Sequence, residues 1–115
     1  MKNNKYDTLI NRLVDSTIKN QICWDKTIRQ EEFKAEVSNY SINITRLSQG
    51  TFSIAKNNTD KYALSLFNEE GDMIDVIEIF TTDEDYQLAV NLYSEARRSF
   101  FKVEDVLDEL IECLQ

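Results

Sequence analysis

The sequence predicts an α+β fold: an N-terminal helix, a four-stranded antiparallel meander sheet, and two C-terminal helices packed on one face of that sheet. Two observations predict it. Apolar residues recur every three or four positions at both ends of the chain, which is the spacing of amphipathic helices. Between about residues 37 and 80 they recur every second position, which is the spacing of strands with one buried face.

The chain has 115 residues, and this length suits a single domain over residues 1–115. Hydrophobic residues make up 42% and charged residues 30%, which is typical of a folded chain. There is no apolar stretch of about 18 residues that could span a membrane, and no apolar run of a signal peptide follows the first lysines. We therefore expect a cytoplasmic protein in which Cys23 and Cys113 are reduced, half-buried thiols.

The first helix is expected over residues 4–19. Asn4 can serve as its N-cap, and Asp7 then lies in the first turn, where the helix dipole favours a carboxylate. Its apolar stripe consists of Tyr6, Leu9, Ile10, Leu13, Val14, Thr17 and Ile18. Packing of this stripe against a core is the favoured use, although an interface helix would show the same pattern.

Residues 20–35 are the hardest to assign. Ile22 and Trp24 alternate with Cys23 and Asp25, which permits a short strand. The segment IRQEEFKAEV that follows fits either a turn of helix or a loop. Trp24, the single tryptophan of the chain, is expected to cover one end of the core with its indole N–H bonded to an acceptor.

Four segments of alternating apolar and polar residues predict the strands. They are NYSINITRL, GTFSIAK, KYALSLF and MIDVIEIF, which begin at residues 39, 50, 61 and 73. The connections are too short for crossover helices, so the sheet should be antiparallel. The fourth segment is apolar on both faces, which indicates a strand in the middle of the sheet or at an interface. Ile77 and Ile79 are therefore candidate partner contacts.

Two helices are predicted after residue 81. Thr82 and Asp85 form an approximate capping box, which would place the neighbouring acidic residues in the first helical turn. The apolar stripe that follows is Tyr86, Ala89, Val90, Tyr93, Ala96 and Phe100, and a second stripe is Val103, Val106, Leu107, Leu110, Ile111 and Leu114. Because the two stripes differ in phase, a break is expected near Lys102.

Two adjacent arginines lie in the first of these helices. Arg98 is predicted to point to solvent, within reach of Glu95. Arg97 falls inside the apolar arc, and two interpretations remain open. Either it stacks on a tyrosine and bonds an acidic residue, or it contacts an external anion.

Charge is distributed unevenly along the chain. Residues 1–68 have ten basic and seven acidic side chains, a balance of +3, whereas residues 69–115 have three and fourteen, a balance of −11. Such a field repels nucleic acid and attracts basic protein surfaces, so we expect no direct nucleic-acid binding. The acidic side chains that we expect to contact a partner are Asp105, Asp108, Glu109 and Glu112.

Most catalytic chemistries lack their residues here. The chain has no histidine, which removes Ser–His and Cys–His pairs and the commonest metal ligand. Its two cysteines are too few for a structural zinc site, and its two glycines are too few for a phosphate-binding loop. Carboxylates such as Glu104 and Asp108 could hold a hard cation, but solvated helix faces have the same pattern. We therefore expect no enzyme activity, no cofactor and no bound metal.

The C-terminal segment resembles that of small uncharacterised bacterial and phage proteins. Such proteins often end in a segment of the type L-Y-x-x-A-R-R-S-x-x-x-V-E-x-V-L-D-x-L, which here runs from Leu92 to Leu110. Their upstream region often has a tryptophan after the first helix and a turn like FNEEGD, matched here by Trp24 and residues 67–72. The resemblance implies a shared fold and a bacterial or phage origin, and it transfers no activity.

The sequence therefore favours a non-catalytic protein that binds another protein, such as an inhibitor, an antitoxin-like or immunity-like protein, or an accessory protein. It would occupy a basic surface of its partner through its acidic C-terminal helices and the strand over residues 73–80. Two alternatives remain: a homodimeric structural or accessory protein, and a small module that binds an anionic ligand with Arg97.

Overall fold

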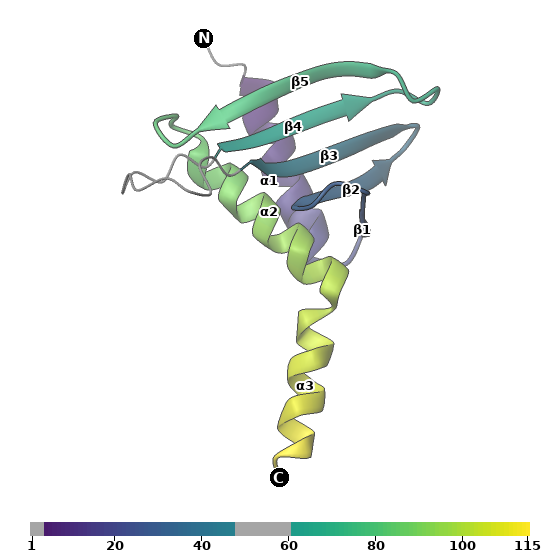
Figure 1. Ribbon diagram of the computed structural model, residues 1–115, viewed down its shortest axis with the longest axis vertical. Coiled ribbons are helices and arrows are strands. Elements are labelled where there is room, and N and C mark those ends of the chain that lie inside the picture. Colours follow the sequence, from purple (N-terminus) through teal and green to yellow (C-terminus); the bar gives the residue numbers. More distant parts are fainter. Residues whose placement is uncertain (1–3, 48–60) are drawn as a thin grey trace.

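The computed structural model describes residues 4–47 and 61–115, and its architecture is α+β (Figure 1). The elements are α1 (Asn4–Ile18), β1 (Trp24–Lys26), β2 (Glu32–Val37), β3 (Tyr40–Leu47), β4 (Lys61–Phe67), β5 (Met73–Phe80), α2 (Tyr86–Phe101) and α3 (Val103–Cys113). The predicted class and the predicted order of helix, sheet and two helices are therefore confirmed.

The strands form one antiparallel sheet in the order β1-β2-β3-β4-β5. The antiparallel meander is confirmed, but the predicted number of four strands is wrong, because the described residues contain five. β1 lies where the sequence permitted a short strand without adding it to the sheet, and β2 lies in the segment expected to be a helical turn or a loop. The strand predicted within GTFSIAK lies outside the described residues, and β3 pairs directly with β4.

β2 takes the place of the helical turn or loop expected for IRQEEFKAEV. Phe33 and Ala35 are buried and pair with Ile44 and Ile42 of β3. The charged residues that alternate with them, which are Glu32, Lys34 and Glu36, point to the other face. The two-residue alternation was present in the sequence. Three charged residues among the six of β2 obscured it.

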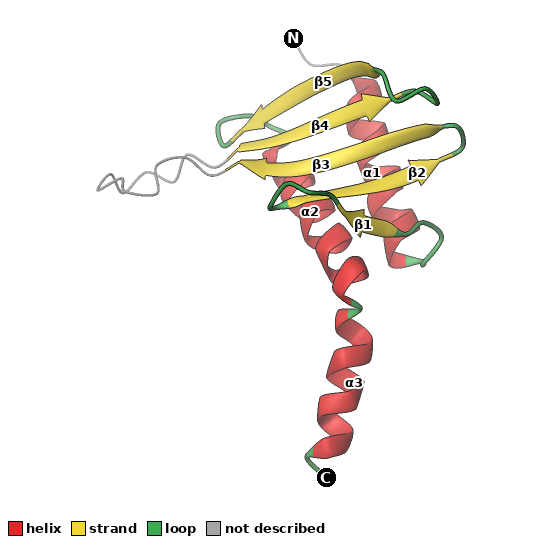
Figure 2. Ribbon diagram, turned by 45° about the vertical axis from the view of Figure 1, so that its right-hand side comes forward, coloured by secondary structure: helices red, strands yellow, loops and turns green. Residues whose placement is uncertain are grey.

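α1 and α2 cover one face of the sheet, and no described helix covers the other (Figures 1 and 2). The core between the helices and the sheet is apolar, and its most completely buried large side chains are Phe33, Ile10, Ile44, Leu64, Ile79 and Leu92. The body of the protein, meaning α1, α2 and the sheet, therefore contains the whole core cluster of the described residues.

Contacts at both ends hold α1 across the sheet. The buried Trp24 of β1 donates its indole N–H to the Thr17 hydroxyl at 2.9 Å, and that hydroxyl donates to the Leu13 carbonyl at 2.7 Å. At the other end of α1, the Tyr6 hydroxyl donates to the Asp75 carboxylate of β5. α1 therefore links the two outermost strands of the sheet.

β5 is an edge strand. Of the two positions expected for residues 73–80, the middle of the sheet is therefore wrong, and a position at an interface stays a prediction. Ile77 is half-buried and Ile79 is only 2% exposed, on the face that the helices cover. These two predicted partner contacts therefore belong to the core. The exposed apolar side chains of β5 are Met73, Ile74, Val76 and Phe80.

The break predicted near Lys102 is confirmed. α2 ends at Phe101, and Lys102 takes the left-handed conformation, with φ 54° and ψ 51°, before α3 begins. The prediction that both C-terminal helices pack on the sheet is wrong, because α1 and α2 take that place and α3 extends away from the body (Figure 1). Among the described elements, α3 contacts α2 alone.

Candidate functional site

The candidate site is the apolar face of α3, because no residue of this helix is buried. Five large apolar side chains are between 44% and 85% exposed at its surface and its C-cap: Val106, Leu107, Leu110, Ile111 and Leu114. At about 100° per residue, these side chains and Val103 cover an arc of about 140°. Contiguous exposed apolar surface of this kind marks sites of interaction with another protein or a membrane.

The carboxylates of α3 lie on the opposite side of the same helix. All are exposed, and they are Glu104, Asp105, Asp108, Glu109 and Glu112. Residues 103–115 contain no basic side chain. The structure therefore brings the four acidic residues of the sequence prediction onto one exposed face, beside an apolar face that the prediction did not include.

A short junction sets the direction of α3. The backbone N–H of Lys102 donates to the Ser99 carbonyl at 3.2 Å, and Val106 donates to the Lys102 carbonyl at 3.1 Å. Arg98 forms an ion pair with Glu104 across the junction, in place of the contact with Glu95 that the sequence suggests. One left-handed residue and one exposed ion pair therefore connect α3 to the body.

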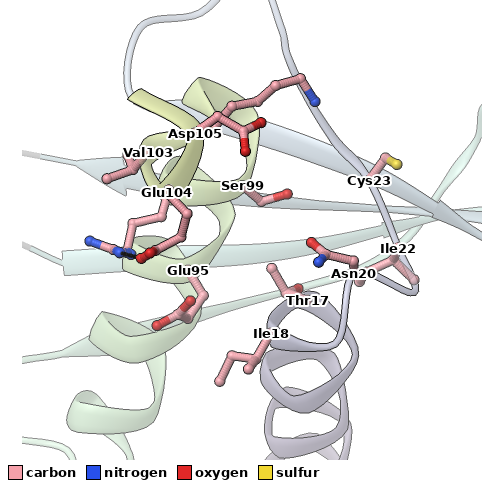
Figure 3. A pocket seen from close by; sticks show the side chains of 12 residues that line it. Thr17, Ile18, Asn20, Ile22, Cys23, Glu95, Ser99, Val103, Glu104 and Asp105 are labelled. Atoms are coloured by element: carbon pink, nitrogen blue, oxygen red, sulfur yellow. Dashed lines mark hydrogen bonds and ion pairs between the residues drawn. The ribbon is translucent and has the colours of Figure 1, made fainter. Parts of the chain in front are cut away.

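A cleft of about 740 Å³ opens where α1 and α2 end and α3 begins (Figure 3). Its apolar lining comes from Ile18 at the end of α1, Ile22 in the following loop, and Val103 in the first turn of α3. The rest of the lining is polar or charged, with one thiol, and consists of Thr17, Asn20, Cys23, Glu95, Arg98, Ser99, Lys102, Glu104 and Asp105. The apolar face of α3 therefore begins inside the cleft.

Comparisons with protein-family models, with curated proteins and with solved structures found no match. Function therefore has to be inferred from the geometry of this chain. Within residues 4–47 and 61–115, no helix is long and apolar enough to cross a membrane. Across the same ranges, no cluster of three or more Cys, Asp or Glu residues is placed to hold a metal ion.

Arg97 is exposed, and its guanidinium lies 5.0 Å from the ring centre of Phe101. The predicted stacking on an aromatic ring is therefore present, on a phenylalanine rather than a tyrosine. The carboxylate of Glu31 accepts a hydrogen bond from the Tyr93 hydroxyl at 2.8 Å and forms an ion pair with the Arg46 guanidinium at 3.4 Å. Burial, followed by the bond to Glu31, raises the pKa of Tyr93 well above its ordinary value. Arg97 is not among the described residues that line the cleft.

The outer edge of β5 is blocked by carboxylates of the chain itself. The backbone N–H of Phe80 donates to the Asp83 carboxylate at 2.7 Å, and the Phe80 carbonyl accepts from the Asp83 N–H at 2.9 Å. The Val76 N–H donates to the Asp75 carboxylate at 2.9 Å. Because Val76 and Phe80 are four residues apart, their amides point to the same edge of the strand. An edge protected in this way is a poor template for pairing with another strand.

Asp83 and Asp85 also show that the predicted capping box is wrong. α2 begins at Tyr86, Asp85 makes no capping side-chain bond, and the first turn of α2 contains no acidic residue. The acidic residues before α2 therefore belong to the connection from β5 to α2, where Asp83 holds the end of β5.

Both cysteines are exposed and unpaired, whereas half-buried thiols were expected. Cys23 lines the cleft, and Cys113 is the last residue of α3. Ile18, which the sequence places at the end of the first apolar stripe, is 58% exposed beside the cleft. The apolar face of α3, Ile18 and Ile22 together form one exposed surface. The two thiols lie at its two ends.

Proposed function

We propose that the protein is a non-catalytic protein-binding module and that α3 is its binding element. The observation that carries this proposal is the exposure of five large apolar side chains on one helix. Covering such surface is favourable by about 25 cal/mol per Å² of apolar area removed from water. The core of the body is formed without α3, so this helix is free to be covered by another molecule.

The width of the apolar face favours a groove on the partner. A two-stranded coiled coil buries only a narrow seam of each helix. The face on α3 covers about 140°, which is the width expected for a helix that lies in an apolar groove. This helix-in-groove mode is a recurrent form of protein recognition.

Charge favours basic residues along the rim of that groove. α3 and the residues after it have five carboxylates and no basic side chain. At about 100° per residue, Glu104 and Glu109 border the apolar face on its two sides, and the other three lie between them on the far side. Lysine or arginine on the rim would pair with them and increase the rate of association. A second copy of the chain has the same carboxylates and a net charge of −8, so it is electrostatically the less favourable partner.

The absence of histidine from the chain supports a role without catalysis. The alternative function, binding of a small anion by Arg97, has less support because Arg97 stacks on Phe101 outside the cleft. A cytoplasmic location and a bacterial or phage origin stay predictions from the sequence.

A synthetic amphipathic helix of leucine and lysine tests the proposal, because it offers both an apolar face and a basic rim. We expect it to bind the protein, as measured by isothermal titration calorimetry. The triple variant Leu107→Ser/Leu110→Ser/Ile111→Ser should bind at least about tenfold more weakly, since central apolar anchors dominate binding energy. Ile28→Ser is the matched control, because Ile28 is fully exposed in the β1–β2 connection.

Equal affinities for the triple variant and the Ile28→Ser control would contradict the proposal. The mass of the protein alone, measured by light scattering, tests the homodimer alternative. A dimer that the triple variant converts to a monomer would favour that alternative over a foreign partner.

A further inference from the structure

We infer that the basic, amphipathic partner segment that lies along α3 continues past the junction and ends in the cleft between α1, α2 and α3. This inference rests on the proposed function and extends it to residues of the body. It assigns Ile18, Ile22 and the surrounding charged residues to the docking surface, in addition to α3.

The first support is the continuity of the apolar surface. Val103 lies near the centre of the apolar arc of α3 and also lines the cleft. Ile18 is 58% exposed and Ile22 is half-buried on the neighbouring wall. An apolar segment that follows the face of α3 toward the body therefore meets Val103 first and then the two isoleucines.

The second support is the length of the surface. α3 has 11 residues, which corresponds to about 16 Å of helix at about 1.5 Å per residue. The cleft adds about 740 Å³, a volume within the range of about 300–1,000 Å³ that is typical of ligand sites. The cleft can therefore accept apolar side chains at the end of a partner segment that is longer than α3.

The third support is the sign of the charge. Arg98 is paired with Glu104. The other charged residues of the lining are two carboxylates, Glu95 and Asp105, and one amine, Lys102. The balance is negative in the cleft and negative along α3. A basic segment complements the whole surface, whereas α3 of a second copy would bring five further carboxylates to it.

The two native thiols allow each end of the surface to be tested separately. Both are exposed, with Cys23 in the cleft and Cys113 at the tip of α3. The variant Cys113→Ser reports only on Cys23, and the variant Cys23→Ser reports only on Cys113. The measurement is the rate of alkylation of each thiol with and without the leucine–lysine helix, over a range of protein concentrations.

We expect the leucine–lysine helix to slow alkylation of both thiols. At a peptide concentration of about 100 times Kd only about 1% of the protein is free, so a fully shielded thiol should react on the order of 100-fold more slowly. Shielding of Cys113 without shielding of Cys23 would overturn this inference and leave the proposed function intact. Shielding of neither thiol would overturn both this inference and the proposed function. Shielding that increases with protein concentration in the absence of peptide would show that the occupant is a second copy, and would overturn the inference.

A matched pair of isoleucine variants supplies an independent readout. Ile18→Ser should reduce affinity for the leucine–lysine helix by about fivefold or more, because a buried apolar contact is lost. Ile28→Ser should leave it unchanged. Equal affinities for the two variants would exclude the cleft from the docking surface, even if the α3 variants lose binding.

Discussion

α2 and α3 are consecutive amphipathic helices with opposite surroundings. α2 buries Ala89, Leu92, Tyr93 and Ala96, while α3 buries nothing. Both helices have apolar residues at helical spacing, and only Lys102 separates them. The comparison teaches that a hydrophobic pattern specifies which face of a helix avoids water. It does not specify whether the same chain or another molecule covers that face.

The two helices also differ in the contacts that position them. Around α2, the ring of Phe33 lies 5.5 Å from that of Tyr93 and 5.8 Å from that of Phe100. α3 depends on the left-handed turn at Lys102 and one exposed ion pair. Substitutions should therefore have large effects on stability in α2 and small effects in α3.

The largest expected difference is between one leucine in each helix. Leu92→Ala should lower the free energy of unfolding by about 2–5 kcal/mol, because it leaves a cavity in the core. Leu110→Ala should change it by no more than about 0.5 kcal/mol, because Leu110 is 54% exposed. Urea denaturation of the two variants measures both values. A loss above about 1 kcal/mol for Leu110→Ala would show that α3 packs on the body in solution.

The second prediction concerns pH and the attachment of α1 to β5. Burial and the bond to Asp75 raise the pKa of Tyr6 from 10.0 to about 12. The unfolded chain therefore loses this proton first, and the stabilising contribution, complete below pH 10, is lost as the pH rises toward 12. Denaturation measured across this pH range should show a smaller decline in the free energy of unfolding for Tyr6→Phe than for the parent protein. Identical declines would mean that Tyr6 does not retain its proton in the folded state.

The smallest expected effect is at the junction. Arg98→Gln or Glu104→Gln should change the free energy of unfolding by less than about 1 kcal/mol, because the pair is exposed and screened by salt. The effect should shrink further in concentrated sodium chloride. A larger loss, insensitive to salt, would make the junction part of the body rather than a connection to an independent helix.

Much of the fold was accessible from periodicity alone. The helices, β3, β4 and β5 follow from apolar spacing, and the change of phase predicted the break at Lys102. β1 was permitted but not counted in the sheet because it has only three residues, and β2 was missed because it is half charged. The edge position of β5 could not be predicted, because an apolar outer face looks the same on an edge strand as on a central one.

The candidate site was only partly accessible. Composition identified the acidic residues of α3, since all five lie between residues 104 and 112. The exposure of the apolar stripe could not be predicted, because its spacing fits a helix covered by its own sheet equally well. The cleft was missed because Ile18 and Val103 are far apart in the sequence and meet only when α1 and α2 end at the same place.

Hydrogen–deuterium exchange of the isolated protein, with and without the leucine–lysine helix, tests the central claim most directly. Amides of α2 should exchange slowly in both conditions, because this helix lies in the core. Amides of α3 should exchange rapidly in the free protein and become protected when the peptide is added. Slow exchange of α3 in the free monomer, or unchanged exchange after peptide binds, would contradict the claim that α3 is an uncovered docking helix.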